Sequence, residues 1–244
     1  MEYALSLKNV NVRVDENFQL KDISWDIPKG MICGLVGKNG AGKTTLIHTI
    51  MNLIERRSGT ILYDNMLYWE HEMEIKKMLN CVFDDFLINK NMKIETYRKA
   101  LQTVYKNFNY EFYRKYMNLF KLWESTKIKS HSLGNQKMLN IIMTMACRPK
   151  ILILDEPTSS LDPTSRATVL DMLLEYMQDE ENTVIFSTHI TSDLDKIADY
   201  ITFIEDGSIL FTKEKNELVE EYAEKMGYMP TVEDIMINLG KDCG

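Results

Sequence analysis

Apolar and polar residues alternate near the start of the chain, over residues 5–14 and again over residues 23–27. Alternation with a period of two is typical of strands with one buried face. Pro28-Lys29-Gly30 supplies turn residues directly after the second segment. We therefore predict that these segments form an antiparallel flank beside a central sheet.

Short, continuous apolar runs follow further along the chain. Residues 151–154 are all isoleucine or leucine, as expected of a strand buried on both faces of a parallel sheet. Further strands are predicted at 31–36, 60–63, 79–83, 183–187 and 200–204. Asp206-Gly207 predicts a hairpin turn after the last of these strands.

Helical spacing of apolar residues separates these strands. It occurs after the first run (Leu46, Ile47, Ile50, Met51, Leu53), at 135–147, after residue 163 (Val169, Leu170, Leu173, Leu174, Met177), at 193–197 and over 213–240. Asp162-Pro163 predicts a helix start, since a capping carboxylate is followed by proline in the first turn. The alternation of strands and helices predicts an α/β fold.

The segment from Asp84 to Ser130 has a different composition: it is rich in tyrosine, phenylalanine, lysine and asparagine and lacks glycine. Aromatic and aliphatic residues recur in it at helical intervals, namely Tyr97, Leu101, Val104, Tyr105 and Phe108, then Phe112, Tyr116, Leu119, Phe120 and Trp123. We predict a helical insertion whose aromatic stripe is mainly core. A partner-binding surface at its rim is the alternative.

A glycine-rich loop lies between the strand 31–36 and the first predicted helix. It consists of Gly37, Lys38, Asn39, Gly40, Ala41, Gly42, Lys43, Thr44 and Thr45. Glycines let the backbone curl so that its N–H groups point at phosphate oxygens, and the helix start adds its positive dipole end. Lys43 can then bind the β- and γ-phosphates, and the Thr44 hydroxyl can bind Mg²⁺. This pattern between strand and helix predicts a nucleotide-binding phosphate loop.

Asp155 and Glu156 directly follow the buried run 151–154, at the strand end where open α/β sheets bind ligands. Asp155 is predicted to hold the same Mg²⁺ as Thr44, and Glu156 to act as general base toward an attacking water. His189 ends the next strand, so we predict that it orients the γ-phosphate. A capping pair and a structural histidine are the alternatives.

Composition and charge limit the possible partners. The 244 residues have a formal net charge of −7, which argues against a broad nucleic-acid footprint. The four cysteines (Cys33, Cys81, Cys147, Cys243) are scattered without zinc-ligand spacing and are expected to be small buried hydrophobes in a reducing compartment. No apolar run approaches the roughly 20 residues needed to cross a bilayer, and we expect a cytoplasmic protein.

Together, the phosphate loop, the run 151–158, Ser159-Ser160-Leu161-Asp162 and Ser187-Thr188-His189 resemble the nucleotide-binding subunit of an ABC transporter over about residues 5–210. The resemblance implies a P-loop NTPase with a RecA-like parallel sheet, an antiparallel β flank and an inserted helical subdomain. It also implies one ABC ATPase domain over 1–244. Its expected parts are a nucleotide-binding core (1–84 and 136–212), the helical subdomain (85–135) and C-terminal helices (213–244).

The family's Leu-Ser-Gly-Gly-Gln motif aligns with His131-Ser132-Leu133-Gly134-Asn135 on spacing, although matching final glutamines would select Gln136 instead. The resemblance implies that Ser132 and Gly134 contact the γ-phosphate bound by a second subunit. Leu133 replaces a glycine. If that position needs φ > 0, we expect strain of about 1–2 kcal/mol.

Two further positions depart from the family pattern. Asp84 stands in the place of a glutamine at the domain junction, and we expect it to contact the nucleotide or Mg²⁺. Val14 stands where many relatives have a tyrosine that stacks on adenine, so Phe18 is the candidate ring, with sheet core as its alternative. The Ser-Leu-Gly loop and Thr231-Val232-Glu233-Asp234-Ile235 resemble bacitracin-exporter-like and other ABC-2 subunits.

The expected function is hydrolysis of ATP with Mg²⁺ to drive transport through a separate integral membrane permease, most simply export. The protein would form a homo- or heterodimer and lie on the inner face of the cell membrane. Two alternatives use the same site: a soluble ABC ATPase of an assembly machine, such as one for iron–sulfur clusters, and a nucleotide-gated regulatory module with little turnover. Glu156 argues against the second, because a module that only binds nucleotide has less use for a base.

Overall fold

A mainly parallel sheet forms the centre of the molecule. The computed structural model describes residues 2–16, 18–84 and 88–242. In this part of the chain the sheet has the order β10-β9-β3-β8-β7-β6. Its strands are β3 (Ile32–Val36), β6 (Leu79–Val82), β7 (Ile151–Asp155), β8 (Thr183–Ser187), β9 (Tyr200–Glu205) and β10 (Ser208–Glu214). Only β10 pairs antiparallel, with β9, so the predicted parallel core and the hairpin at Asp206-Gly207 are confirmed.

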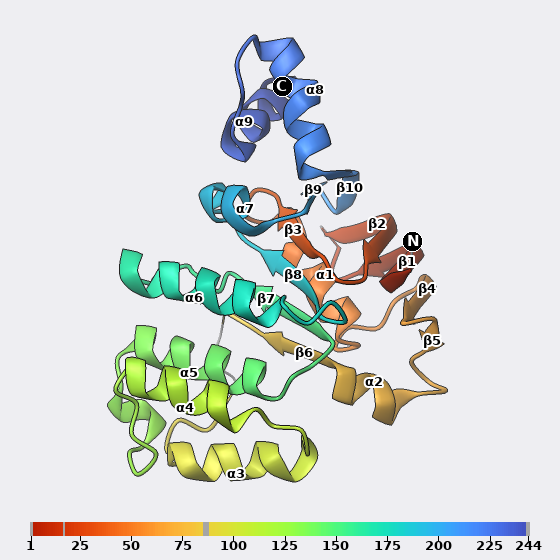
Figure 1. The fold of residues 1–244 in the computed structure, drawn as a ribbon. Coiled ribbons are helices and arrows are strands. Elements are labelled where there is room, and N and C mark those ends of the chain that lie inside the picture. Colours follow the sequence, from red (N-terminus) through yellow and green to blue (C-terminus); the bar gives the residue numbers. More distant parts are fainter. Residues whose placement is uncertain (1, 17, 85–87, 243–244) are drawn as a thin grey trace.

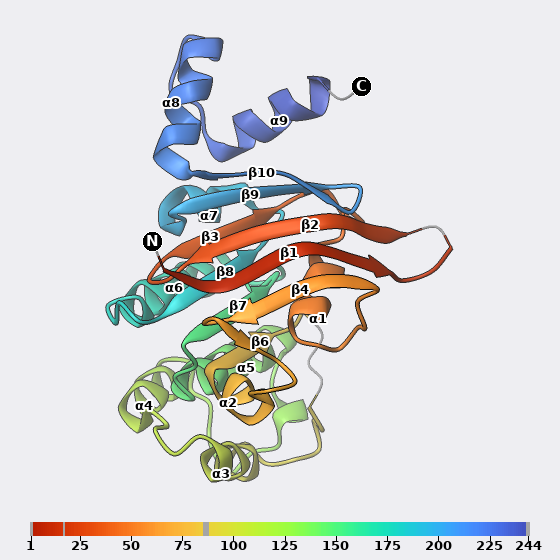
Figure 2. The same ribbon diagram turned by 90° about the vertical axis from the view of Figure 1, so that its right-hand side faces the viewer.

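A second sheet is antiparallel and lies beside the first (Figure 2). Its order among the described residues is β2-β1-β4-β5. The strands are β1 (Tyr3–Arg13), β2 (Gln19–Pro28), β4 (Ser58–Tyr63) and β5 (Met66–Leu67). The predicted antiparallel flank is therefore confirmed.

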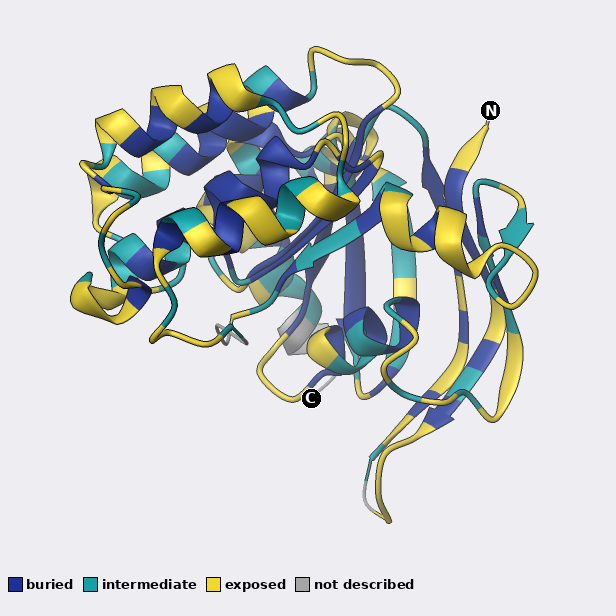
Figure 3. Cartoon of the chain, turned by 90° about the horizontal axis from the view of Figure 1, so that it is seen from below, coloured by how far each residue is buried: buried dark blue, intermediate teal, exposed yellow. Residues whose placement is uncertain are grey.

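The strands of the central sheet separate two hydrophobic clusters. Leu152 and Leu154 pack into one cluster with the helices of the insertion, while Ile151 and Ile153 pack into the other with α1 (Lys43–Ile50) and the flank. Every residue of β7 is buried. Strands at the centre of the molecule are mostly dark blue, that is buried, in Figure 3. Burial on both faces explains why this strand is a continuous apolar run instead of an alternating one.

Helices cover the sheets and extend from both ends of the molecule (Figure 1). Besides α1 they are α2 (Glu72–Met78), α3 (Ile94–Val104), α4 (Tyr110–Leu119), the 3-10 turn η1 (Ile128–Ser130), α5 (Leu133–Ala146), α6 (Pro163–Tyr176), α7 (Thr191–Ile197), α8 (Lys215–Met226) and α9 (Val232–Asp242). Asp162 caps α6 by accepting hydrogen bonds from the N–H groups of Thr164 and Ser165, as predicted.

The inserted helices use only part of their aromatic stripe as core. Tyr97, Phe112 and Tyr116 are buried and pack in the cluster that contains α5. Val104 is 53% exposed and Leu119 and Trp123 are each 59% exposed, so the prediction of core is wrong at these positions. Leu119 and Trp123 lie where α4 ends and the chain turns back toward α5, and the rim of the stripe was predicted as the alternative partner surface.

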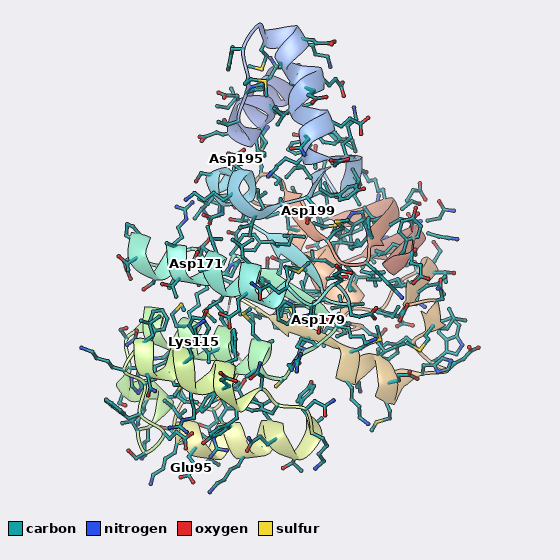
Figure 4. The ribbon with its side chains drawn as sticks, in the orientation of Figure 1. Glu95, Lys115, Asp171, Asp179, Asp195 and Asp199 are labelled. Atoms are coloured by element: carbon teal, nitrogen blue, oxygen red, sulfur yellow. The ribbon has the colours of Figure 1, made fainter. Side chains whose placement is uncertain are left out.

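The C-terminal helices are joined to the core through α7. The backbone N–H of Val232, the first residue of α9, donates to Asp195 Oδ1 at 2.9 Å, and Asp195 is labelled between α7 and the terminal helices in Figure 4. α8 begins at Lys215 and not at 213, because β10 continues to Glu214. No described helix is long and apolar enough to cross a bilayer.

Several local predictions need correction. α2 was not predicted, since only Ile75 of its seven residues is buried and no periodic apolar face marks it. Leu174 was placed on the core face of α6 but is 49% exposed. α1 ends at Ile50, so Leu53 lies beyond the helix and is 60% exposed.

The cysteines behave as small apolar residues. Cys33 and Cys147 are buried and Cys81 is half-buried, whereas Cys243 lies outside the described residues. Burial raises the pKa of the Cys147 thiol to about 12 and also raises the pKa of the Cys33 thiol well above its ordinary value, so both stay protonated.

Candidate nucleotide-binding site

The phosphate loop connects the end of β3 to the start of α1. Gly42 caps α1 with φ +111°, a conformation that side chains rarely adopt. A Cβ atom at this position would also lie 2.9 Å from Leu20 Cδ2 and 3.0 Å from Phe18 Cζ. Glycine is therefore required here, and the first N–H groups of α1 stay open toward the loop.

Lys43 lies inside the curl of this loop. Its side chain is 7% exposed, and Nζ donates hydrogen bonds to Gly37 O at 2.8 Å and Lys38 O at 3.4 Å. The same Nζ lies 3.8 Å from Glu156 Oε1. The exposed residues of the loop are Lys38, Asn39, Gly40 and Thr44. Its buried residues include Gly37, Ala41 and Gly42, and Thr45 is half-buried. The loop thus places one ammonium group between its own carbonyls and the carboxylate that follows β7.

Thr44 and Asp155 meet directly although they are far apart in sequence. Thr44 Oγ1 donates to Asp155 Oδ2 at 2.9 Å, and Ser187 Oγ donates to Asp155 Oδ1 at 3.0 Å. Asp155 is 2% exposed. Ser187 was not singled out from the sequence, although it precedes Thr188-His189 and pairs with Asp155 across β7 and β8.

The oxygen atoms of Thr44 and Asp155 fit a magnesium ion. Mg²⁺ prefers oxygen ligands and is usually held by one or two protein groups together with substrate phosphates. Among the described residues no group of three or more histidine, cysteine, aspartate or glutamate side chains could hold a metal alone. The arrangement therefore suits an ion that arrives with a polyphosphate.

Glu156 occupies an unusual backbone conformation and bridges two candidate residues. Its φ is +48°, and its N–H donates to Ser187 O at 2.9 Å. Its Oε2 lies 2.7 Å from His189 Nδ1 and accepts a hydrogen bond from the His189 N–H at 3.3 Å. Glu156 thus lies between Lys43 and His189, with 15% of its side chain exposed.

Asp84 is engaged by residues that the sequence did not suggest. Its Oδ1 accepts hydrogen bonds from Lys137 Nζ at 2.7 Å and from Ser159 Oγ at 3.3 Å. Lys137 is in the second turn of α5. In sequence it is an ordinary helical lysine, so no signal set it apart. The carboxylate that was predicted to contact nucleotide or Mg²⁺ is thus paired with an ammonium group.

Phe18 lines an open groove next to the phosphate loop. The groove has a volume of about 580 Å³ and is bordered by Arg13, Gly40 and Asp206 among others. Phe18 is half-buried and packs against the apolar cluster of the flank. Its position is therefore compatible with both predicted roles, a ring that stacks on the base and a residue of the sheet core. Val14 is 48% exposed.

The hairpin tip between β9 and β10 joins the flank to the phosphate loop. Gly207 N donates to Ala41 O at 3.0 Å, and Gly207 O accepts from Lys21 N at 2.8 Å. A Cβ atom on Gly207 would lie 2.0 Å from Gln19 O, so only glycine fits. The three segments are therefore held together at one residue.

The loop at Ser132 leads into the start of α5. Ser132 Oγ caps the helix by accepting from Asn135 N at 3.2 Å, and within the described chain no hydrogen bond or ion pair joins 132–135 to the phosphate loop. Leu133 is the first helical residue and has no positive φ, so the condition under which strain was expected is not met. Gly134 is half-buried, and Gln136 is buried with Nε2 donating to His131 O at 2.7 Å.

The strand, glycine loop and helix, with a carboxylate at the end of β7, a parallel strand separated from β3 only by β8, define a P-loop NTPase fold. The sequence also matches the ABC transporter family over residues 20–159. This chain therefore belongs to the ABC transporter ATP-binding family, whose members are ATPases, and the family resemblance is confirmed.

Individual relatives and structures agree with this assignment. The ABC transporter ATP-binding protein YtrB of Bacillus subtilis (strain 168) is 30% identical over 223 residues, which are 89% of this chain and 74% of YtrB. The methionine import ATP-binding protein MetN of Lactobacillus johnsonii is 33% identical over 239 residues, covering 91% of this chain and 67% of MetN. A solved ATP binding subunit of an ABC transporter has a TM-score of 0.85 at 19% identity, covering 97% of this chain and 99% of that chain, which shows a shared fold.

Proposed function

We propose that this chain binds ATP with Mg²⁺, pairs with a second nucleotide-binding subunit, and hydrolyses ATP to drive a separate membrane permease from the cytoplasmic face. The contact that carries the proposal is the 2.9 Å hydrogen bond between Thr44 and Asp155, next to the enclosed Lys43. These groups come from the start of α1, which follows β3, and from the end of β7, at one edge of the sheet, where a polyphosphate tail would be bound from both sides.

Each residue of this edge has a proposed role in binding. Lys43 and the backbone N–H groups of 37–45 hold the β- and γ-phosphates, while Thr44 and Asp155 hold the metal. When bound, Mg²⁺ neutralises charge on the phosphate oxygens. The groove beside Phe18 is proposed to take the nucleobase, since it begins at the exposed Gly40 of the loop.

Glu156 and His189 are the proposed catalytic pair. Glu156 accepts a proton from the water that attacks the γ-phosphorus, while the bond from that phosphorus to the ADP oxygen breaks. His189, whose Nδ1 lies 2.7 Å from Glu156 Oε2, keeps the carboxylate aligned with the γ-phosphate. Lys43, 3.8 Å from Glu156 Oε1, offsets the negative charge that gathers there.

A second copy or a related subunit is proposed to complete each site. Ser132 and the open N–H groups at the start of α5 provide the same helix-terminus chemistry as the phosphate loop, at an exposed position. ATP bound between Lys43 of one subunit and Ser132 of the other would join the two, and hydrolysis would release them.

Glu156→Gln tests the catalytic assignment. We expect steady-state phosphate release to fall at least about 100-fold, because an amide cannot accept the proton, while ATP affinity and ATP-dependent dimerisation are retained. Glu224→Gln, on the exposed face of α8, is the matched control and should behave as wild type. Unchanged turnover in Glu156→Gln would refute the base, and a wild-type dimer that binds ATP but releases no phosphate would favour a regulatory module.

Purification with detergent-solubilised membranes tests the permease. We expect a polytopic membrane protein to co-purify; recovery with soluble partners alone would favour an assembly ATPase. The proposed direction is export, supported by the resemblance of the Ser-Leu-Gly loop to exporter subunits. The MetN relative is named for import, so ATP-driven uptake of cargo into inverted membrane vesicles is the deciding measurement for export.

A further inference from the structure

Lys137 is a nearly enclosed cation close to the site but outside the phosphate loop. Its side chain is 11% exposed, although it lies on α5 only five residues after Ser132. Enclosing an ammonium group is costly unless it is paired and hydrogen-bonded. The role of Lys137 can therefore be inferred from the groups that pair with it.

Those partners come from two other loops at the edge of the sheet. Lys137 Nζ donates to Glu156 O at 2.5 Å, to Ser159 Oγ at 2.8 Å and to Ser159 O at 3.3 Å, all in the segment after β7. It also pairs with Asp84 Oδ1 at 2.7 Å, in the segment after β6. One ammonium group thus joins α5, the loop that carries Glu156, and the entrance to the helical insertion.

The contact with Glu156 explains how its backbone is held. A residue with a side chain loses about 1–2 kcal/mol in the left-handed conformation, and Glu156 has φ +48°. Its N–H donates to Ser187 O on one side, and its carbonyl accepts from Lys137 and from Ser159 Oγ on the other. With both ends fixed, the carboxylate is directed to Lys43 and His189.

Asp84 supplies the charge that Lys137 needs. The Asp84 side chain is 60% exposed, so most of its solvation is retained while one oxygen pairs with the enclosed ammonium. A glutamine in this place would leave the cation with carbonyl and hydroxyl partners only. Asp84 thus places a negative charge where the family pattern has a neutral glutamine, and this charge balances the positive charge of Lys137.

We propose that Lys137 is a positioning residue for ATP hydrolysis, which holds the Glu156 peptide in its left-handed conformation, and that Asp84 is its counter-ion. The inference rests on the proposed role of Glu156 as general base. It adds a direct link from the entrance of the helical insertion to the catalytic carboxylate within one subunit.

The test is a double-mutant cycle on the full-length protein with Lys137→Met, Asp84→Asn and the double variant. We expect Lys137→Met to lower kcat about 10–100-fold while the Kd for ATP changes less than about threefold, because the phosphate loop is untouched. Asp84→Asn should lower kcat about 3–10-fold, since the carbonyl contacts of Lys137 remain. The double variant should match Lys137→Met alone, because the two residues act through one contact.

Lys99→Met is the matched control, since Lys99 also pairs with a carboxylate, Glu95, but on the solvent face of α3. It should leave kcat unchanged. Equal kcat for Lys137→Met and wild type, or independent multiplication of the two single effects, would overturn the proposal. If Lys137→Met does not fold, Lys137→Gln retains a donor for the Glu156 carbonyl and should give an intermediate kcat; wild-type kcat there would also refute the proposal. Absence of hydrolysis in the wild-type dimer would instead refute the proposed function itself.

Discussion

The two helix starts that are proposed to bind phosphate, those of α1 and α5, differ in how complete they are. At α1 the side chains already contact each other: Lys43 is 7% exposed and Thr44 is hydrogen-bonded to Asp155. At α5 the cap is formed only within its own first turn, and Leu133 beside it is 76% exposed. The N-terminus of a helix therefore lies in an enclosed site at α1 and on an open surface at α5.

This difference teaches that local geometry alone does not make a helix start into a binding site. At α1, Thr44 is hydrogen-bonded to Asp155 of β7, the proposed second metal ligand, whereas no carboxylate is hydrogen-bonded to Ser132 at the start of α5 within the described residues. Under the proposed function, the missing partner of α5 is the nucleotide on another subunit. The following experiments act on that distinction.

Mixing two inactive variants should give the largest effect. We expect Lys43→Ala and Ser132→Ala homodimers to lose at least about 100-fold in turnover, since each removes one side of both sites. Random mixing should restore about a quarter of wild-type turnover, because half of the dimers are mixed and each mixed dimer contains one intact site of two. Phosphate release from the mixture is the measurement.

Each variant incubated with a second batch of itself is the control for this mixture. No recovery of activity on mixing, with mixed dimers verified by two different affinity tags, would mean that both helix starts act within one subunit. That outcome would remove the distinction between the enclosed and the open region.

Replacing the exposed leucine should have a moderate effect on the open region alone. We expect Leu133→Gly to raise the dissociation constant of the ATP-linked dimer about tenfold, as a partly buried leucine side chain is lost from the interface. Nucleotide affinity of the monomer should not change. Dimerisation followed by analytical ultracentrifugation and nucleotide titration of the monomer separate the two effects.

The same variant also tests the backbone. Glycine at the first position of α5 should lower stability slightly, because Leu133 has no positive φ to relieve. A higher melting temperature for Leu133→Gly would mean that the leucine is strained after all. It would contradict the geometry of α5.

The attachment of the helical insertion to the core should give the smallest effect on activity. Glu175 of α6 pairs with Lys115, which is labelled in Figure 4, and accepts a hydrogen bond from Tyr116 of α4. Burial raises the pKa of Glu175, but these hydrogen bonds outweigh it, so the pKa lies below its ordinary value. This contribution to stability is therefore present above the ordinary pKa and is lost as pH falls through the lowered one.

We expect Glu175→Gln to lower the melting temperature by about 2–4 °C at pH 7 and turnover by less than about twofold. The difference in melting temperature between variant and wild type should shrink as the pH falls below 4.5, the ordinary value. Lys99→Met, which breaks an exposed pair inside one helix, is the control and should show a smaller shift. A difference that persists in acid would mean that the pair does not depend on the charge of Glu175.

The sequence was most informative where chemistry is local. The phosphate loop, the buried strand before Asp155 and the cap at Asp162 could be predicted because neighbouring residues determine each of them. The helical insertion was also evident, but its exposed side was not, since Leu119 and Trp123 share the spacing of buried residues.

Contacts between distant segments were out of reach. Lys137 is a polar residue in a helix, which in sequence is indistinguishable from a solvated lysine, yet it is enclosed by the loops after β6 and β7. The strain expected at Leu133 assumed that a glycine is present for its backbone freedom. The helix begins at Leu133, two residues before the predicted start at residue 135, and the φ of Leu133 is not positive.

Gly207 has a consequence for how nucleotide affinity is distributed. One residue is hydrogen-bonded to both the antiparallel flank and Ala41, so a tilt of the flank must displace the loop. The favourable binding free energy of the base in its groove then adds to that of the phosphates, because the flank and the phosphate loop do not have to be aligned with each other when the nucleotide binds. Loosening that joint would therefore weaken binding of a whole nucleoside triphosphate more than binding of tripolyphosphate, which has no base to be aligned.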